Sequence, residues 1–314
     1  MIPLRAALTG ATGFLGLHLL PALLQAGYNV RILARRDPSH PAWQGLNFET
    51  VRGGLEDTGA LAELVRGADL VIHSAGLIKA RRGEDFLTVN RDGTVALAAI
   101  TRRQAPLARF LQISSLAARE PQLSDYSFSK YAAELAARLI FADASEQLAI
   151  IRPPAIYGPW DKETLPLFQS TQRRFSAVIG RGRLTVIHAG DAASAIVALT
   201  KHWRPGRFTL ADDHPQGYRM RDLLLAGAKA TGGTPRLVQL PDPVVLAAGR
   251  AIGLLARISG KTQIFGLGKA REALHPDWSV SREELLPPEI YTPRFGLDAG
   301  FADTVAWYRQ AGWL

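Results

Sequence analysis

The chain of 314 residues contains no cysteine. This absence excludes disulfide bonds, thiolate metal sites and a cysteine nucleophile, and is compatible with any compartment. Long apolar runs are absent too, because no uncharged apolar segment reaches the roughly 20 residues that span a bilayer. The N-terminus has no charged leader ahead of an apolar stretch and leads directly into a glycine-rich turn. We therefore expect a soluble, cytoplasmic protein with no integral membrane segment.

Acidic residues are fewer than basic ones, 28 against 37, which leaves a formal charge of +9. The cations are scattered in doublets, such as Arg102 with Arg103, without a run of five or interleaved aromatic residues. A nucleic-acid partner is therefore not expected, and an anionic cofactor or substrate accounts for the charge better. Because no His, Asp and Glu residues have metal-ligand spacing, we expect no metal site.

The first half of the chain alternates short apolar runs with longer amphipathic ones. The short runs lie at 4–8, 29–34, 48–52, 70–73, 110–114 and 148–152, and the amphipathic ones at 14–25, 58–65, 85–103 and 126–144. This rhythm predicts an α/β fold with a Rossmann-type, doubly wound parallel sheet. We expect 1–160 and 185–212 to form a dinucleotide-binding domain, and 161–184 and 213–314 a smaller α+β substrate-binding domain. After about residue 160 the sequence also predicts a strand at 184–188 and a helix at 192–201.

Three glycines follow the first predicted strand in the segment LTGATGFLG, residues 8–16. Gly10 is suited to a turn with positive φ, Gly13 lets a phosphate approach the backbone, and Gly16 lets the next helix pack closely on the strand. The helix N-terminus then points unpaired N–H groups at the turn. The segment predicts a diphosphate-binding turn, although a glycine-rich turn alone is a weak signal.

A second motif lies in ISSLAAREPQLSDYSFSKYAAEL, residues 113–135, where Tyr126 precedes Lys130 by four positions. On a helix this spacing puts the phenol and the ammonium group on one face. A nearby cation favours the phenolate and lowers the tyrosine pKa toward neutrality, as a general acid or base requires. The same pattern also occurs as a solvated lysine beside a half-buried tyrosine, so its context after a glycine turn and a serine-ended strand is what favours catalysis.

Together with VIHSAG (71–76), VNRDGT (89–94), RPPAIYGP (152–159), VIHAGDAASA (186–195) and the final GLDAGFADTVAWYRQAGWL, these motifs resemble the extended short-chain dehydrogenases/reductases of the epimerase/dehydratase family. The resemblance implies an enzyme using NAD or NADP on a small-molecule substrate. It implies that Tyr126 is the acid/base, that Lys130 holds the nicotinamide ribose, and that Ser115, or alternatively Ser114, bonds the reacting oxygen. The implied cofactor contacts are Gly10, Thr12, Gly13, Phe14, Leu15, Ala75, Gly76, Pro153 and Ile156.

Other polar residues in these motifs have simpler interpretations. By the same resemblance His73 supports the adjacent turn and Asn90 anchors neighbouring backbone, while Asp191 is expected to cap a helix beginning at residue 192. His188 and Trp160 are candidates for the substrate pocket.

Two departures from the family pattern concern the cofactor. The frequent Gly-Asp-Leu appears as Gly53-Gly54-Leu55, so the acidic contact near the adenine is missing and Leu55 is left at that position. Where NAD-using relatives carry an Asp, Ala34 is followed by Arg35 and Arg36. Because an arginine binds a 2′-phosphate that an acid would repel, we expect NADP to be preferred over NAD.

The sequence constrains the type of reaction less than it constrains the cofactor. The residues after Ser115 are Leu116, Ala117 and Ala118, without the Asp-Glu pair of the family's dehydratases. The apolar stretch 243–258, with its two arginines, and the segment 268–280 resemble branches that act on hydrophobic alcohols and ketones, although a plain core helix also fits 243–258. We expect hydride transfer on a hydrophobic substrate, with a nucleotide-sugar epimerase and a non-catalytic dinucleotide-binding protein as alternatives. A homodimer through 85–103 and 126–144 is possible by the same resemblance.

Overall fold

The structure is a computed structural model that describes the backbone of residues 3–259 and 266–314 and the side chains of all of these except 256–259. The chain forms two compact units. The first comprises Met1–Arg152 and Ala193–Phe208, and the second comprises Pro153–Ala192 and Thr209–Leu314. That one of them binds the dinucleotide and the other the substrate stays a prediction.

The first unit is built on a seven-stranded sheet with the order β11-β6-β5-β4-β1-β2-β3. Strands β1 to β6 pair in parallel, so their carboxyl ends lie along one edge, where ligands bind in such sheets. This order, reversing at β1 and β4, confirms the expected doubly wound Rossmann-type fold. The strands are β1 (Arg5–Thr9), β2 (Asn29–Ala34), β3 (Glu49–Arg52), β4 (Leu70–His73), β5 (Arg109–Ile113), β6 (Leu148–Arg152) and β11 (Gly206–Thr209).

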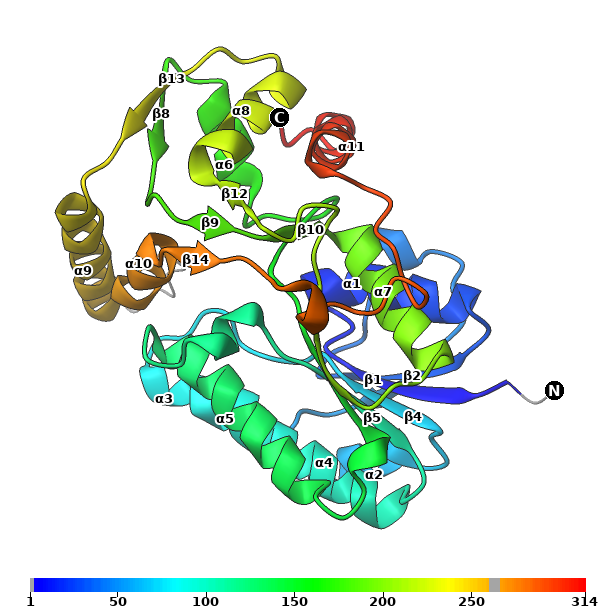
Figure 1. The fold of residues 1–314 in the computed structure, drawn as a ribbon. Helices are drawn as coiled ribbons and strands as arrows, with labels where there is room; N and C mark the ends of the chain where they lie inside the picture. Colours follow the sequence, from blue (N-terminus) through cyan, green and yellow to red (C-terminus); the bar gives the residue numbers. More distant parts are fainter. Residues whose placement is uncertain (1–2, 260–265) are drawn as a thin grey trace. The chain divides into compact units, whose positions relative to one another are not determined.

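Helices cover both faces of this sheet (Figure 1). On one face lie α2 (Thr58–Val65), α4 (Gly93–Gln104) and α5 (Asp125–Ile140), and on the other lies α1 (Phe14–Gln25) with the C-terminal part of α7 (Ala189–Lys201). Apolar side chains of α2 and α4, such as Leu64 and Leu97, join Val71 and Phe110 of the sheet in one buried cluster. Short turns of 3₁₀-helix lie at Pro41–Trp43, Leu116–Arg119 and Ser145–Gln147.

The prediction of one continuous helix at 85–103 is wrong, because the segment is divided into three pieces. The structure has α3 (Gly83–Phe86), a π-helical segment (Leu87–Asp92) and then α4. The Asn90 side chain bonds both backbone groups of Leu77, at 2.7 and 3.1 Å, and so fixes the π-helical segment against the loop after β4. Gly93 then begins α4 without a Cβ, which would lie only 2.6 Å from Leu55 Cδ1. The wider turn is thus a packing solution that hydrophobic periodicity does not reveal.

The second unit packs helices around a buried aromatic core. Tyr157, Phe168, Phe301 and Tyr308 form its centre, with ring centroids of Phe301 4.8 Å from those of both Tyr157 and Phe168. Its helices are α6 (Leu165–Thr171), α8 (Met220–Thr231), α9 (Asp242–Ser259), α10 (Leu267–Leu274) and α11 (Leu297–Gln310), with a 3₁₀ turn at Arg282–Glu284. Its strands are β7 (Ala155–Tyr157), β8 (Phe175–Val178), β9 (Arg183–Leu184), β10 (Val186–His188), β12 (Tyr218–Arg219), β13 (Arg236–Gln239) and β14 (Asp277–Trp278).

The strand expected at 184–188 is two strands, β9 and β10, separated by Thr185. The buried Thr185 hydroxyl lies 2.8 Å from Trp278 O and 3.2 Å from Pro215 O. The interruption lets β9 join β12 and β14 while β10 pairs with β7.

Candidate active site

The turn between β1 and α1 requires two of its glycines by its geometry. Gly10 has φ +75°, and a Cβ there would lie 2.5 Å from Ala75 N and from Ser74 C. A Cβ on Gly16 would lie 2.2 Å from Gly10 O. Gly16 therefore lets α1 approach the turn itself, and not the strand as expected. Gly13 is the N-cap of α1 and offers no side-chain cap, which leaves the first N–H groups of the helix for an anionic ligand.

A buried histidine holds this turn against the neighbouring strand. His73, at the end of β4, lies between the hydroxyls of Thr9 and Thr94, at 2.8 and 3.1 Å. Thr9 Oγ1 also accepts a bond from Ala75 N at 3.2 Å. Burial, with a smaller contribution from Lys130, lowers the pKa of His73 from 6.5 to about 3. His73 is thus neutral and fully used in hydrogen bonds, in agreement with its expected supporting role.

Lys130 is buried where three parts of the first unit meet. Its Nζ donates to Ile113 O, the last carbonyl of β5, at 3.2 Å. A Cβ on Gly76 would lie 3.1 Å from this Nζ and 2.9 Å from Asn90 Oδ1, so only glycine fits beside the ammonium group. Burial lowers the pKa of Lys130 from 10.5 to about 8, and the Glu134 charge opposes that shift. The ammonium group therefore sits at the carboxyl edge of the sheet, next to the loop after β4.

Tyr126 lies in the first turn of α5, one turn before Lys130. The helix begins at Asp125, with Ser124 as its N-cap accepting from Ser127 N. The half-buried Tyr126 ring makes an edge-to-face contact with Phe86, at 5.9 Å between centroids. The i,i+4 placement of phenol and ammonium on one helix is as the sequence predicts.

The two serines after β5 have different environments. Ser114 is buried, and its hydroxyl proton is donated to Glu134 Oε1 of α5 at 2.6 Å. Ser115 is half-buried, caps the next 3₁₀ turn and accepts from Ala117 N at 3.2 Å, which leaves its hydroxyl proton for another acceptor. Of the two, Ser115 is the better placed to donate to a substrate.

The sequence analysis missed the ion pair between Glu134 and Arg152. Arg152, at the end of β6, donates to both carboxylate oxygens of Glu134 at 2.8 and 2.7 Å, and both side chains are buried. Glu134 also receives Ser114, so one carboxylate joins α5 to the ends of β5 and β6. A single acidic residue in the apolar stretch after Lys130 is the signal that could have indicated it.

The residues expected near the adenine end lie on the surface of the first unit. Arg35 and Arg36 follow β2 and are exposed. The neighbouring Asp37 forms an ion pair with Arg52. Leu55 is half-buried against Gly93 and the hydrophobic cluster of the sheet. The exposed guanidinium groups are compatible with a phosphate contact, while Leu55 packs largely within the protein.

In the second unit the expected helix cap at Asp191 is wrong. The helix α7 begins three residues earlier than expected, at Ala189, so Asp191 lies inside its first turn. Its buried carboxylate instead accepts from Tyr291 OH, at 2.7 Å, and from the backbone of Arg294 and Phe295, at 3.0 and 2.9 Å. Asp191 thus ties the segment before α11 to α7.

The remaining candidates also lie in the second unit. His188 is buried, with its ring 4.2 Å from that of Phe295 and its Nε2 3.2 Å from Asp303 Oδ2. Burial lowers the pKa of His188 despite this carboxylate. Trp160 has φ +72°, and its ring contacts that of Trp307 at a tilt of 51°, with 4.5 Å between centroids. Pro153 is buried and Ile156 half-buried. All of these contacts are with other residues of the protein. A substrate contact of His188 or Trp160 therefore stays a prediction.

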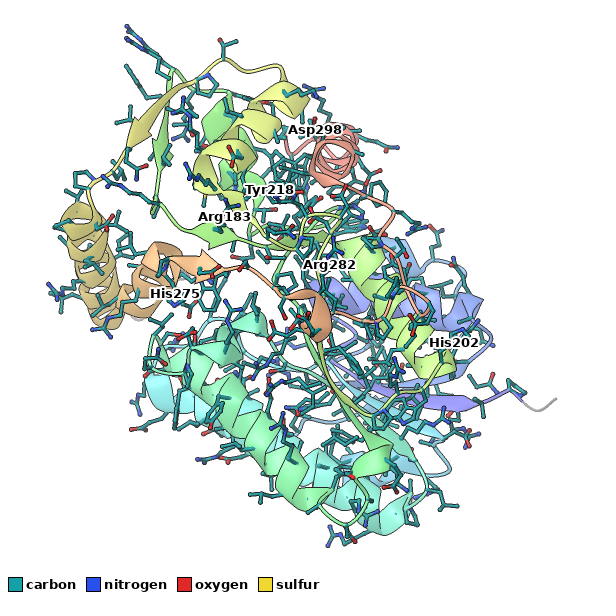
Figure 2. The ribbon with its side chains drawn as sticks, in the orientation of Figure 1. Arg183, His202, Tyr218, His275, Arg282 and Asp298 are labelled. Atoms are coloured by element: carbon teal, nitrogen blue, oxygen red, sulfur yellow. The ribbon has the colours of Figure 1, made fainter. Side chains whose placement is uncertain are left out.

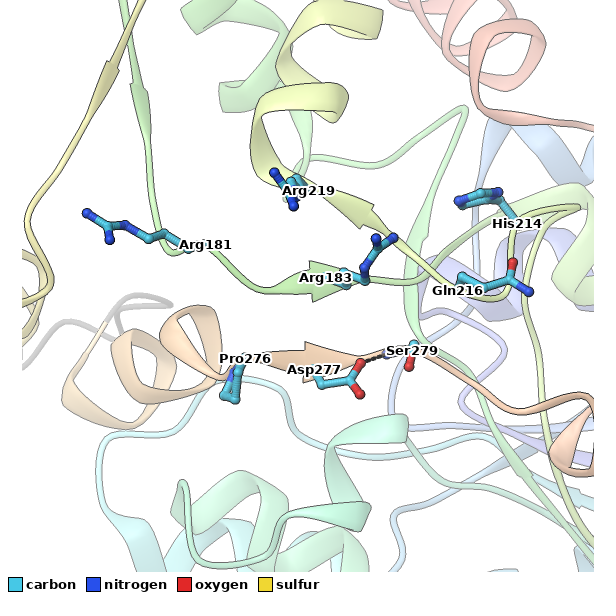
Figure 3. A pocket seen from close by; sticks show the side chains of 8 residues that line it. All are labelled: Arg181, Arg183, His214, Gln216, Arg219, Pro276, Asp277 and Ser279. Atoms are coloured by element: carbon cyan, nitrogen blue, oxygen red, sulfur yellow. Dashed lines mark hydrogen bonds between the residues drawn. The ribbon is translucent and has the colours of Figure 1, made fainter.

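An open pocket of about 670 Å³ lies on the sheet β12-β9-β14 of the second unit (Figure 3). Arg183 stands opposite both Arg219 and Asp277 in the strand register, and Arg181 and His214 also line the pocket. Tyr218, labelled in Figure 2, precedes Arg219 on β12. Its hydroxyl donates to Asp212 at 2.9 Å. The pocket can bind polar or anionic groups, and none of the predicted site residues lines it.

Two further properties concern the described residues alone. Within 3–259 and 266–314, no cluster of three or more His, Asp or Glu side chains could hold a metal ion. Among the helices in the same part of the chain, none is long and apolar enough to span a bilayer.

Comparisons with known proteins identify the family. The model of the NAD dependent epimerase/dehydratase family matches residues 6–211. The chain therefore belongs to this family of extended short-chain dehydrogenases/reductases, and it is an NAD(P)-dependent oxidoreductase.

Individual relatives refine this picture. A ceramide reductase of Caulobacter vibrioides is 46% identical over 98% of this chain and 95% of its own. Sterol demethylase protein B of Methylococcus capsulatus is 29% identical over 98% of both chains. Among solved structures, gox2253 matches with a TM-score of 0.78 at 23% identity, covering 99% of each chain. DesIV of Streptomyces venezuelae, a dTDP-glucose 4,6-dehydratase with NAD bound, matches with a TM-score of 0.74 at 20% identity over 99% of this chain and 98% of its own. The solved structures share the fold.

Proposed function

We propose that this chain reduces a ketone on a hydrophobic, ceramide-like lipid, with NADPH as the hydride donor. The observation that carries the proposal is the 46% identity to a ceramide reductase over nearly the whole chain. A sterol demethylase protein and a ketoreductase of a farnesylated quinoline, 31% identical over 68% of this chain, support a hydrophobic substrate.

The site fits a dinucleotide because the glycine turn has room for no side chain at Gly10 and presents the open N-terminus of α1. Arg35 would receive the 2′-phosphate that distinguishes NADP from NAD. When bound, the dinucleotide supplies a hydride. The residues that would hold it are Gly10, Thr12, Gly13, Phe14, Leu15, Arg35, Arg36, Leu55, Ala75, Gly76, Lys130, Pro153 and Ile156.

The proton in this reaction would come from Tyr126. Tyr126 would donate its phenolic proton to the carbonyl oxygen as the carbon–oxygen π bond opens on reduction, which would leave an alcohol and a phenolate. The Lys130 ammonium group, one helical turn away, stabilises that phenolate, and Ser115 donates a hydrogen bond to the same substrate oxygen. Water then returns a proton to Tyr126.

Nucleotide-sugar epimerisation is the weaker candidate for this chain. The solved structures that act on nucleotide sugars match at 20% identity or below, a level that carries the fold and not the substrate.

The proposal is tested by following NADPH consumption with a keto-ceramide analogue and, separately, the appearance of epimerised product from UDP- and dTDP-sugars, because epimerisation consumes no net cofactor. We expect turnover of the ketone alone. The variant Tyr126→Phe should lose about 10²–10⁴-fold in kcat because it lacks the transferable proton. The matched control Tyr131→Phe, on the same helix and also half-buried, should keep normal turnover. Turnover confined to nucleotide sugars, or near-normal turnover by Tyr126→Phe, would refute the proposal.

A further inference from the structure

One face of α9 is apolar and exposed. Val244, Leu254 and Leu255 expose 51%, 60% and 63% of their surface. Ala247, Ala248 and Ala251 are exposed between them. These positions recur every three or four residues, so they form one stripe along the helix. We call this stripe the α9 face. The sequence left a core helix open as an interpretation for this segment, and the exposure of its described side chains contradicts that interpretation.

The opposite side of α9 is the one that packs against the protein. Val245 is only 2% exposed. A Cβ on Gly249 would lie 2.9 Å from the Cβ of Ala270, so α10 crosses α9 closely at this glycine (Figure 1). The α9 face therefore points away from α10. A long exposed apolar stripe on a helix is uncommon on proteins that have no partner, and it indicates an interaction surface.

The exposed charges on α9 and on the segments that pack against it are mostly cationic. Arg250 is exposed on α9 itself, and Lys269 and Arg271 are exposed on α10. Exposed Arg181 belongs to the loop 180–182, whose glycines pack on the backbone of residues 273–276 at the end of α10. Among the described side chains of α9 and α10, Asp242 is the one exposed acid, at the first position of α9, because Glu272 is buried and paired with Lys269.

We propose that the α9 face is a docking surface for an anionic lipid bilayer. Apolar side chains enter the boundary between headgroups and acyl chains, while Arg250, on the same helix, attracts the lipid phosphates. The choice of this partner rests in part on the proposed function, because a ceramide-like substrate resides in membranes. A second copy of the chain fits less well, because a two-fold contact through this face would place the Arg250 side chains of both copies in one interface.

Vesicle co-sedimentation without substrate or cofactor tests this proposal separately from the proposed function. The probes are vesicles of phosphatidylcholine and of equal parts phosphatidylcholine and phosphatidylglycerol. We expect tighter binding to the mixed vesicles, weakened by salt. The double variant Leu254→Asp with Leu255→Asp should bind both at least about tenfold more weakly. Arg250→Ala should lose about fivefold on mixed vesicles and little on neutral ones.

The matched control is Leu107→Asp, the same replacement at a leucine that is 87% exposed in the first unit; it should bind vesicles like the wild type. Turnover of a water-soluble short ketone should be equal in all these proteins, which shows that the double variant is folded. Wild-type protein that sediments with neither vesicle, or a double variant that binds like the wild type, would overturn the proposal. So would a lipid-free dimer that the double variant abolishes, because it would identify a second copy as the occupant.

Discussion

Lys130 is the buried residue whose charge makes the clearest contribution to pH dependence. Its pKa falls from 10.5 to about 8 on folding, chiefly because of burial. Below about pH 8 the folded chain holds a charged buried group, whereas the unfolded chain keeps the proton up to 10.5. The penalty therefore disappears as pH rises through that window, and Lys130 should add about 3 kcal/mol to the free energy of unfolding across it.

Urea unfolding of the wild type and of Lys130→Met at about pH 7 and about pH 10 measures this contribution. The difference between the two proteins should shift in favour of the wild type at the higher pH. Other lysines and tyrosines titrate in both proteins and cancel in the comparison. Parallel pH dependence in the two proteins would show that the native pKa of Lys130 is not lowered.

The buried pair of Glu134 and Arg152 should be sensitive to loss of one charge. Glu134→Gln leaves Arg152 buried without its carboxylate, and we expect a loss of about 3–5 kcal/mol in the free energy of unfolding. The control is Asp298→Asn, which breaks a pair with Lys229 that is also short, 2.6 Å, but has side chains 60% and 73% exposed. That change should cost less than about 1 kcal/mol. Equal losses in both variants would contradict the burial argument.

At the scale of the element, α1 and α9 each contain an interior glycine in a different environment. Gly16→Ala would place a Cβ 2.2 Å from Gly10 O and should destabilise the protein and weaken NADPH binding, because α1 must move off the turn. A Cβ from Gly253→Ala would meet no atom of the described residues within 4 Å, so this change should stabilise the helix by about 0.5–1 kcal/mol. Thermal unfolding with and without NADPH distinguishes them. An unchanged NADPH affinity in Gly16→Ala would show that this close packing does not position the turn.

Sequence patterns predicted best those helices and strands whose pattern of apolar residues is set by packing against the core alone. The strands 29–34, 70–73 and 148–152 were predicted with the bounds that the structure has, because each consists mostly of buried apolar residues. The π-helical segment and the division at Thr185 were not predicted, since both depend on hydrogen bonds to residues distant in the chain. The contacts of Asp191 escaped prediction for the same reason. Roles of Tyr126, Ser115 and the cofactor residues stay predictions.

For the whole molecule, the choice of cofactor is measurable as a stabilisation. A ligand that binds the folded chain alone adds about 2.7 kcal/mol at a concentration 100 times its Kd. NADPH should therefore raise the Tm more than NADH at equal concentration, and Arg35→Ala should remove that difference while leaving the NADH effect unchanged. The NADP preference fails if NADH protects the wild type better, or if the NADPH effect is indifferent to Arg35→Ala.

Exposed apolar side chains on α5, Phe128, Leu135 and Leu139, suit the homodimer that the family resemblance implies. This dimer stays a prediction. It would involve other residues than the α9 face, so oligomerisation and vesicle binding are separable by mutation.

The contact between Gly10 and Ala75 joins two segments that are synthesised far apart. The phosphate cradle that the glycine turn predicts between β1 and α1 is complete only when β4 has paired with β1. The Ser74–Ala75 backbone and the Thr9 hydroxyl then pack against this turn. A nascent chain that ends before this crossover has the glycine motif but no cradle. A dinucleotide bound at this turn would therefore bind only a chain in which β1 and β4 have paired. It should prolong the lifetime of the native state by slowing unfolding, and leave the rate of refolding nearly unchanged.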